Sequence, residues 1–272
     1  MIATLRMEFR KYFTTRTWWA LLLITFVWTG LNVATMVLAI HFGRSEMTAE
    51  QGFFLPSGDA VARLIYSMGT TFGYVFPAIV GAMSVAGEYR HQTITPTLLT
   101  DPARWRVLAA KFLSVVPLSA LYAVTVVVGC LVFGSALLAA LGEPTALGDV
   151  KTWEMFARMI LAMTLWGLVG VGLGALLTNQ MVAIVTLLGI TMFLEPTLRS
   201  LPMLIGRDIP ALAYLPGALG DAVTGATLFS MFGPGGTGAG LLGFLPATAL
   251  LLLYAVVLTA AGYLLRFRRD IP

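Results

Sequence analysis

The hydrophobic positions of this chain fall into six long apolar runs that are separated by polar segments. An apolar run of about 20 residues is long enough to cross a bilayer as a helix. Transmembrane strands would instead alternate apolar and polar positions over short segments. The pattern predicts an all-α integral membrane protein with a single domain, residues 1–272, and spans at 18–40, 61–86, 107–141, 155–177, 181–194 and 246–265.

Residues 1–16 precede the first run and are too polar to cross a bilayer. On a helical wheel they form an apolar face of Ile2, Leu5, Phe9, Tyr12 and Phe13 and a polar face of Arg6, Glu8, Arg10 and Lys11. A basic amphipathic helix of this kind lies in the membrane interface. The alternative is the charged start of a signal peptide, but the following apolar run is too long for one.

The main polar, basic segment between two runs is residues 87–106, GEYRHQTITPTLLTDPARWR. It contains two pairs that are typical of helix starts, Thr95-Pro96 and Asp101-Pro102. Thr and Asp are good N-caps, and Pro suits the first helical position. We therefore expect a short helix that begins at Pro96 and stops just before the second pair, where a new helix begins.

The new helix should continue into the third span. Arg104 and Lys111 fall on one face of it, and we expect both to project into the cytosol. A transporter needs a short helix outside the membrane to contact a soluble motor. Residues 87–106 are therefore predicted to be a cytoplasmic coupling element.

Two spans carry glycines at the small-xxx-small spacing, Gly69 with Gly73 and Gly170 with Gly174. This spacing lets two membrane helices approach closely, so we expect helix packing at both pairs. Pro77 should kink the second span. No lysine follows the glycines near Gly170, which argues against a nucleotide-binding loop.

Composition supports a membrane protein and excludes several other classes. Hydrophobic residues make up 58% and charged residues 11% of the chain, whereas soluble proteins carry about 25% charged residues. The net charge of +4 is too small and scattered for nucleic-acid binding. His41 and His91 lie at opposite ends of the bundle, so we expect neither a metal site nor catalytic residues. Cys130 is the one cysteine, which rules out an internal disulfide.

The positive charges predict the orientation. Six spans place both termini on one side, and eleven of the 17 Lys and Arg residues then fall on that side. By the positive-inside rule both termini and residues 87–106 are cytoplasmic. We expect a multi-pass protein of a prokaryotic cytoplasmic membrane.

Residues 195–245 are partly apolar but are interrupted by Pro, Gly and charged residues. We expect Glu195-Pro196 to end the fifth span and short re-entrant or interfacial helices to follow on the external side. Irregular backbone at this depth needs protein or water around it. Glu195 is the one notable acid, either an ordinary interfacial carboxylate or a group that binds a cationic substrate or gates an exit.

The segment after the second span resembles the permease subunits of type 2 ATP-binding-cassette (ABC-2) exporters. The resemblance is carried by E-Y-R-H-Q-T at 88–93, L-L-T-D-P at 98–102 and the basic start of the third span at 104–111. Gln92 departs from the pattern, because the family often has Gly there. The resemblance implies a dimer of permeases, either two copies or two paralogues, and two ATPase subunits that carry ATP and Mg²⁺.

The residues agree with this division of labour, since the chain contains no GxxxxGK[ST] loop and needs a motor from another polypeptide. Ile94, Leu98 and Leu99 should enter a hydrophobic cleft on that partner. Glu88 should pair with Arg90, Arg104 or a partner arginine. The predicted ATPase-coupling residues are Glu88, Tyr89, Arg90, Thr93, Ile94, Leu98, Leu99 and Arg104.

We expect an ATP-driven exporter of hydrophobic or amphipathic molecules, such as lipids, drugs, peptides or glycans. Spans one, two and five would face the second permease, as the resemblance implies. The alternatives are a secondary transporter or channel that uses Glu195, and a membrane-embedded enzyme. The latter needs clustered ionisable groups within the bilayer.

Overall fold

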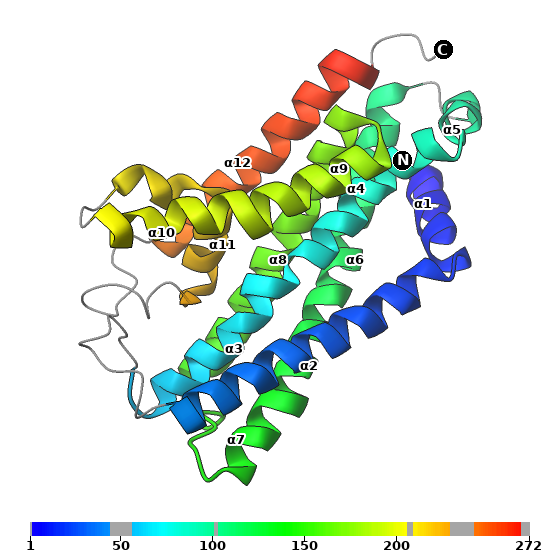
Figure 1. Cartoon of the computed structure of the whole chain (residues 1–272). Helices are drawn as coiled ribbons and strands as arrows, with labels where there is room; N and C mark the ends of the chain where they lie inside the picture. Colours follow the sequence, from blue (N-terminus) through cyan, green and yellow to red (C-terminus); the bar gives the residue numbers. More distant parts are fainter. Residues whose placement is uncertain (1, 44–55, 101–102, 206–208, 229–241, 268–272) are drawn as a thin grey trace.

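The computed structural model of the chain describes residues 2–43, 56–100, 103–205, 209–228 and 242–267 (Figure 1). No strand occurs among these residues. Six helical segments are long and apolar enough to cross a membrane, and they are Thr17–Gly43, Asp59–Arg90, Arg104–Ala140, Val150–Leu177, Gln180–Pro202 and Phe244–Phe267. The predicted all-α membrane fold with six spans is confirmed.

Helix α1 spans Ile2–Thr14 and precedes α2, Thr17–Gly43, which is the first span. Two helices form the second span, α3 (Asp59–Gly73) and α4 (Val75–Arg90), and the short α5 follows at Ile94–Thr100. The third span consists of α6 (Arg104–Gly129), the π-helix η2 (Cys130–Ser135) and α7 (Ala136–Ala140).

The fourth span is α8, Val150–Leu177. The fifth consists of α9 (Gln180–Leu188), the π-helix η3 (Gly189–Leu194) and α10 (Glu195–Ile205). A 3-10 helix η4 (Pro210–Tyr214) and helix α11 (Pro216–Thr224) lead to the sixth span, α12 (Phe244–Gly262) with the π-helix η6 (Tyr263–Phe267).

Helix α8 is the centre of the bundle and packs against α4, α6, α11 and α12. Its contact with α4 is close because small residues face each other. A Cβ atom on Gly170 would lie 2.0 Å from the carbonyl oxygen of Ala78, and one on Gly174 would lie 2.4 Å from that of Ala82. The backbones of α4 and α8 therefore touch, as small residues allow in membrane helices.

The second glycine pair packs against a different span. A Cβ on Gly69 would lie 2.6 Å from Sγ of Cys130, and one on Gly73 would lie 3.1 Å from Val126. Both glycines therefore admit side chains of the third span. Together the two pairs pack the second span against both the third and the fourth spans.

The second span is interrupted at Tyr74, between α3 and α4. Pro77 lies one turn further on and has no N–H to donate to the carbonyl of Gly73. A proline inside a helix removes this bond and breaks or kinks the helix at the preceding turn. The interruption lies at the place where the sequence predicts a kink.

The fifth span continues beyond Glu195-Pro196, where we expected it to end. The helix continues from the π-helix η3 through Glu195, whose backbone is right-handed helical, and α10 runs to Ile205. The π-helix η3 ends at Leu194, two residues before Pro196. A π-turn shifts the register of the backbone hydrogen bonds. The lack of an N–H at Pro196 therefore does not end the helix. The expectation of a helix end at this pair was wrong.

The boundaries of the coupling element also differ from those expected. Helix α5 begins at Ile94, two residues before Pro96, and α6 begins at Arg104. Pro96 lies in the first turn of α5, where an N–H has no helical partner and its loss costs little. The expected start at Pro102 lies outside the described residues.

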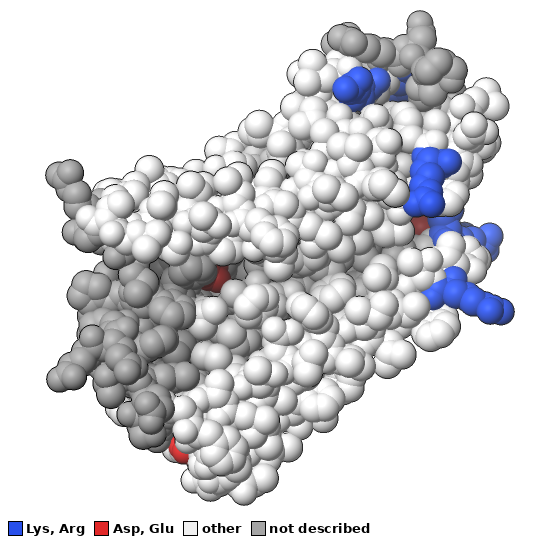
Figure 2. Space-filling view, viewed as in Figure 1, with Lys and Arg blue, Asp and Glu red and all other residues white. Residues whose placement is uncertain are grey.

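The two ends of the bundle carry different elements (Figure 1). Helices α1 and α5 and the last turns of α12 lie at one end, whereas α7, α10 and α11 lie at the other. On the face shown in Figure 2, Lys and Arg side chains gather at the first of these ends. This end is called the basic end below.

Candidate functional site

A tight turn connects the basic end of α4 to helix α5. Thr93 N donates to the carbonyl of Glu88 at 2.9 Å, and Gln92 between them has a φ of 55°. A left-handed residue that follows a helix end is most often glycine, because other residues pay a steric cost there. The turn directs α5 away from the α4 axis toward α1 and α6.

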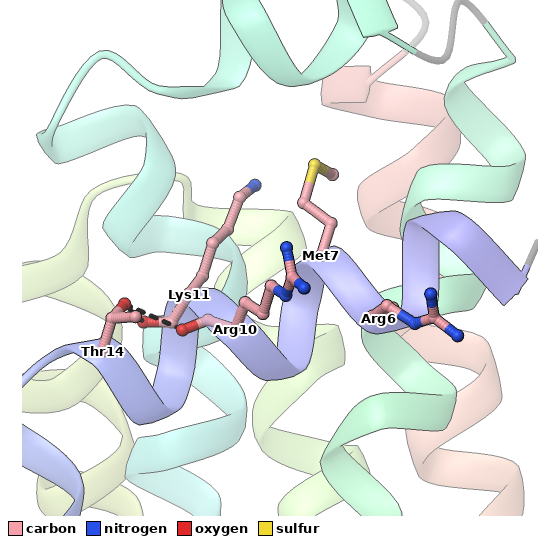
Figure 3. A pocket seen from close by; sticks show the side chains of 5 residues that line it. All are labelled: Arg6, Met7, Arg10, Lys11 and Thr14. Atoms are coloured by element: carbon pink, nitrogen blue, oxygen red, sulfur yellow. Dashed lines mark hydrogen bonds between the residues drawn. The ribbon is translucent and has the colours of Figure 1, made fainter.

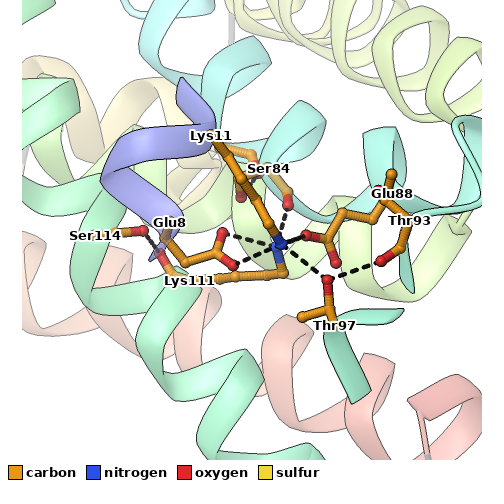
Figure 4. A network of polar contacts seen from close by, with 9 residues as sticks. Glu8, Lys11, Ser84, Glu88, Thr93, Thr97, Lys111 and Ser114 are labelled. Atoms are coloured by element: carbon orange, nitrogen blue, oxygen red, sulfur yellow. Dashed lines mark hydrogen bonds and ion pairs between the residues drawn. The ribbon is translucent and has the colours of Figure 1, made fainter. Parts of the chain in front are cut away.

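A cluster of two lysines and two glutamates lies next to Thr97 of α5 (Figure 4). Lys111 is fully buried, and its Nζ lies 2.8 Å from Glu8 Oε2 and 2.8 Å from Glu88 Oε1. Its Nζ also donates to the carbonyl oxygen of Ser84 at 2.8 Å. A buried ammonium needs such partners, because burial of an unpaired charge is costly.

Lys11 joins the same cluster from α1. Its Nζ lies 2.5 Å from Glu88 Oε1 and 3.4 Å from Glu8 Oε1, and donates to Thr97 Oγ1 of α5 at 2.8 Å. Thr97 in turn donates to the carbonyl oxygen of Thr93 at 2.8 Å. The charge cluster, Glu8, Lys11, Glu88 and Lys111, therefore connects α1, α4, α5 and α6.

The four charges balance one another. Burial lowers the pKa of Lys11, but the hydrogen bond to Glu88 and the fields of Glu8 and Glu88 outweigh it and raise the pKa above its ordinary value. Lys11 is therefore charged at neutral pH. Hydrogen bonds between ionised groups are stronger than neutral ones, so the cluster is a firm joint among the four helices.

The cluster corrects three expectations. Glu88 pairs with Lys11 and Lys111, not with Arg90 or Arg104. Lys111 does not project into the cytosol, because α1 and α4 cover it. Glu8 and Lys11 lie on the expected water-facing side of α1, yet they point into the protein (Figure 4).

The apolar residues of α5 divide between the protein and the solvent. Ile94 is buried and Leu98 is partly buried against the core, whereas Leu99 is 78% exposed. Ile94 therefore holds α5 to its own chain and does not offer itself to a partner. Leu99 is the apolar residue of α5 that remains available for docking.

The remaining predicted residues contact other parts of the chain. The Tyr89 ring meets Phe267 edge-on at 6.0 Å, and Arg104 donates to the carbonyl of Phe267 at 2.7 Å. Arg90 Nη1 lies 3.5 Å from Oε1 of Gln180. The two arginines therefore fasten the coupling element to the sixth span and to α9.

The side chain of Thr93 is exposed, and its backbone alone takes part in the turn. The sequence interpretation missed Glu8, Lys11, Lys111 and the 56% exposed Trp105 at the start of α6. The sequence did carry one indication for Lys111. This residue lies at the start of an apolar run, where an ionisable side chain usually has a charged or polar partner.

Within the described residues, no group of three or more His, Cys, Asp and Glu side chains is placed to hold a metal ion. At the basic end, the short helix α5 lies outside the bundle of spans and is bound to it by the charge cluster. The family model described as ABC-2 family transporter protein matches residues 2–197. The chain belongs to this family. A comparison with curated proteins finds no match.

The matched region of this ABC-2 permease contains all four members of the charge cluster and the whole of α5. An ABC-2 permease is the multi-pass membrane component of an ABC transporter and associates with an ABC ATPase subunit. This assignment makes the chain a transport component of an ABC transporter. The left-handed backbone at Gln92 also explains why glycine suits that position in the family.

Glu195 lies at the opposite end of the permease and has a structural role. Its side chain is buried, and its two carboxylate oxygens accept hydrogen bonds from the backbone N–H groups of Gly217 at 2.9 Å and Ala218 at 2.8 Å. These are the second and third residues of α11, whose first N–H groups have no helical partner. Glu195 therefore caps α11 and has no access to an external ligand in this conformation.

The buried cap predicts a stability effect. Glu195→Ala should leave two buried N–H groups without acceptors, at a cost of about 1–3 kcal/mol each. Glu195→Gln should lose less, because its carbonyl oxygen still accepts. Thermal unfolding of the two purified variants in detergent compares them. Equal melting temperatures for Glu195→Ala and the wild type would contradict the capping role.

Proposed function

We propose that this permease is the membrane subunit of an ATP-driven exporter in a prokaryotic cytoplasmic membrane. A second copy or a paralogue completes the permease pair, and two ATPase subunits supply ATP hydrolysis with Mg²⁺. The substrate is a hydrophobic or amphipathic molecule. The observation that carries the proposal is the short helix α5, which lies outside the bundle of spans and exposes Leu99. The charge cluster binds α5 to three other helices.

The cluster supplies a route for force from the motor to the spans. A push on α5 displaces Thr97, which is bonded to Lys11, and Lys11 shares Glu88 with Lys111. Glu88 belongs to α4 and Lys111 to α6. Movement of α5 therefore displaces the ends of the second and third spans together, and not α5 alone.

The distribution of charge supports the proposed orientation. The basic end carries α1, α5 and the end of α12, and Lys and Arg side chains gather there (Figure 2). Positive charge is retained on the cytoplasmic side of membrane proteins. The basic end is then cytoplasmic, where soluble ATPases have access to Leu99.

The surfaces of spans one and five support an apolar substrate. Trp28 and Leu31 on α2 and Val185 on α9 are exposed, and so is Phe193 on η3. In the described parts of α2 and α9 no Asp, Glu, Lys or Arg side chain occurs. A path between these helices and a second permease would therefore be lined by hydrophobic groups.

The docking role of Leu99 is testable. Leu99→Asp should weaken ATPase binding by at least about tenfold, because a buried interface anchor is typically worth more than 1 kcal/mol. The tagged chain is purified in mild detergent with its co-expressed ATPase, and bound ATPase is quantified. Thr15→Asp, which adds the same charge to an exposed position of the basic end, is the matched control.

The result separates the site from the function. Loss of ATPase in Leu99→Asp but not in Thr15→Asp would support docking on α5. Equal recovery of ATPase in both variants would place the dock elsewhere. A wild-type chain that binds no P-loop ATPase, even with its neighbouring genes expressed, would overturn the exporter proposal itself.

A further inference from the structure

A hollow of about 410 Å³ lies along α1 (Figure 3). Its five lining side chains all come from this helix and are Arg6, Met7, Arg10, Lys11 and Thr14. Arg6 and Arg10 are exposed and lie one helical turn apart on the same side. The hollow is therefore bordered by three cationic side chains.

Two of these three cationic side chains form no ion pair with an acidic residue in the part of the chain that the structure describes. Lys11 is paired with Glu88 and Glu8, but neither Arg6 nor Arg10 has an acidic partner among the described residues. Glu8, the one acid of α1, faces the opposite way and binds Lys111. The guanidinium groups of Arg6 and Arg10 are thus free to bind an anion from outside the protein.

Aromatic residues fix the depth of the hollow. Phe13, beside the lining residue Thr14, is 45% exposed and meets Trp18 edge-on at 5.3 Å, while Trp19 is 49% exposed. Exposed Trp side chains at the start of a span lie at the level of the lipid headgroups. The basic hollow on the adjoining helix therefore lies at headgroup depth.

We propose that the hollow binds the phosphate of an anionic phospholipid headgroup. Guanidinium groups match phosphate oxygens with paired hydrogen bonds. Basic residues next to a span attract anionic lipids, and each contributes measurably near the surface. Met7 provides an apolar wall for the glycerol part of the lipid.

The site would also affect the coupling element. Lys11 borders the hollow on one side and binds Glu88 and Thr97 on the other. A phospholipid held by Arg6 and Arg10 would fix α1 against the membrane, and α1 in turn holds α5 through Lys11. The lipid would then set the position of α5 before any motor binds.

The test compares lipids on the purified full-length chain in an uncharged detergent. Native mass spectrometry measures binding of phosphatidylglycerol and of phosphatidylcholine with identical acyl chains. The wild type should prefer phosphatidylglycerol by about tenfold. Arg6→Gln with Arg10→Gln should abolish this preference, whereas Arg6→Lys with Arg10→Lys should keep most of it. The control, Arg90→Gln with Arg106→Gln, removes the same charge from the same end and should retain the preference.

Several results would overturn the proposal. Equal binding of the two lipids by the wild type, or an equal loss of preference in the control, would show that the hollow is not a specific site. Displacement of phosphatidylglycerol by inorganic phosphate at millimolar concentration would point to a soluble phosphate ligand instead of a lipid. None of these measurements needs the ATPase. The test of the lipid site is therefore independent of the test of the proposed export function.

A measurement on the wild type alone covers the case in which the double variant does not fold. Phosphatidylglycerol with a photoreactive headgroup is bound and irradiated, and the labelled peptides are mapped. Labelling within residues 2–17 is expected. Labelling confined to other helices would refute the site.

Discussion

Lys111→Met is expected to destabilise the permease by about 3–5 kcal/mol, the usual cost of removing one partner from a buried ion pair. Lys111 is fully buried, and its ammonium lies against both Glu8 and Glu88. Without it, Lys11 alone would have to balance two buried carboxylates. Thermal unfolding of the purified chain in detergent, followed by circular dichroism, measures the loss.

A second substitution tests the cause of this loss. Glu8→Gln combined with Lys111→Met leaves the neutral pair of Lys11 and Glu88, so the double variant should be more stable than Lys111→Met alone. Lys11→Met should cost less than Lys111→Met, because the Lys11 side chain is 36% exposed. A double variant no more stable than Lys111→Met would mean that lost packing, and not charge, dominates.

Gly170→Ala should also destabilise the permease clearly. The added methyl would lie 2.0 Å from the backbone oxygen of Ala78, and a backbone atom cannot rotate out of the way as a side chain can. Helices α4 and α8 would have to separate, and overpacking of this kind costs about 1–3 kcal/mol. A lower melting temperature and a broader size-exclusion peak are the expected results.

Gly189→Ala is the matched control for this substitution. A Cβ at Gly189 meets no atom within 4 Å, and alanine has the higher helix propensity. This variant should melt at the wild-type temperature or slightly above it. If Gly170→Ala melts together with Gly189→Ala, the close approach of α4 and α8 does not limit stability.

The spans could be predicted because each depends on one continuous stretch of sequence. An apolar run long enough to cross a bilayer satisfies its backbone internally as a helix, whatever its neighbours are. The pair Thr95-Pro96 likewise indicated a short helix from local signals alone. The family could be recognised for the same reason, since its motif lies within one segment.

The charge cluster could not be predicted because its members come from three separate stretches of the chain. A helical wheel of residues 1–16 assumes membrane on one side and water on the other. In the structure only part of the polar face of α1 meets protein, so Glu8 and Lys11 are turned inward while Arg6 and Arg10 stay exposed. Ile94 was misassigned for the same reason, because its neighbours in space are distant in sequence.

Glu195 shows a different limit of sequence interpretation. An acid at the end of an apolar run next to proline indicated a helix end and a candidate gate. Its partners are the first free N–H groups of α11, more than a helix away along the chain. Caps between distant elements leave no local pattern, unlike the N-caps that precede their own helix.

The two sides of α1 should respond differently to ionic strength. Its inner side holds Glu8 and Lys11 in the charge cluster, in which Glu8, Glu88 and Lys111 are buried, and buried pairs are screened only weakly by salt. Its outer side exposes Arg6 and Arg10, whose attraction to anions fades within a Debye length of about 8 Å in physiological salt. With the basic end in the cytoplasm and a lipid on Arg6 and Arg10, as we propose, a change of internal salt would alter the contact of α1 with the membrane and leave its bonds to α5 largely unchanged.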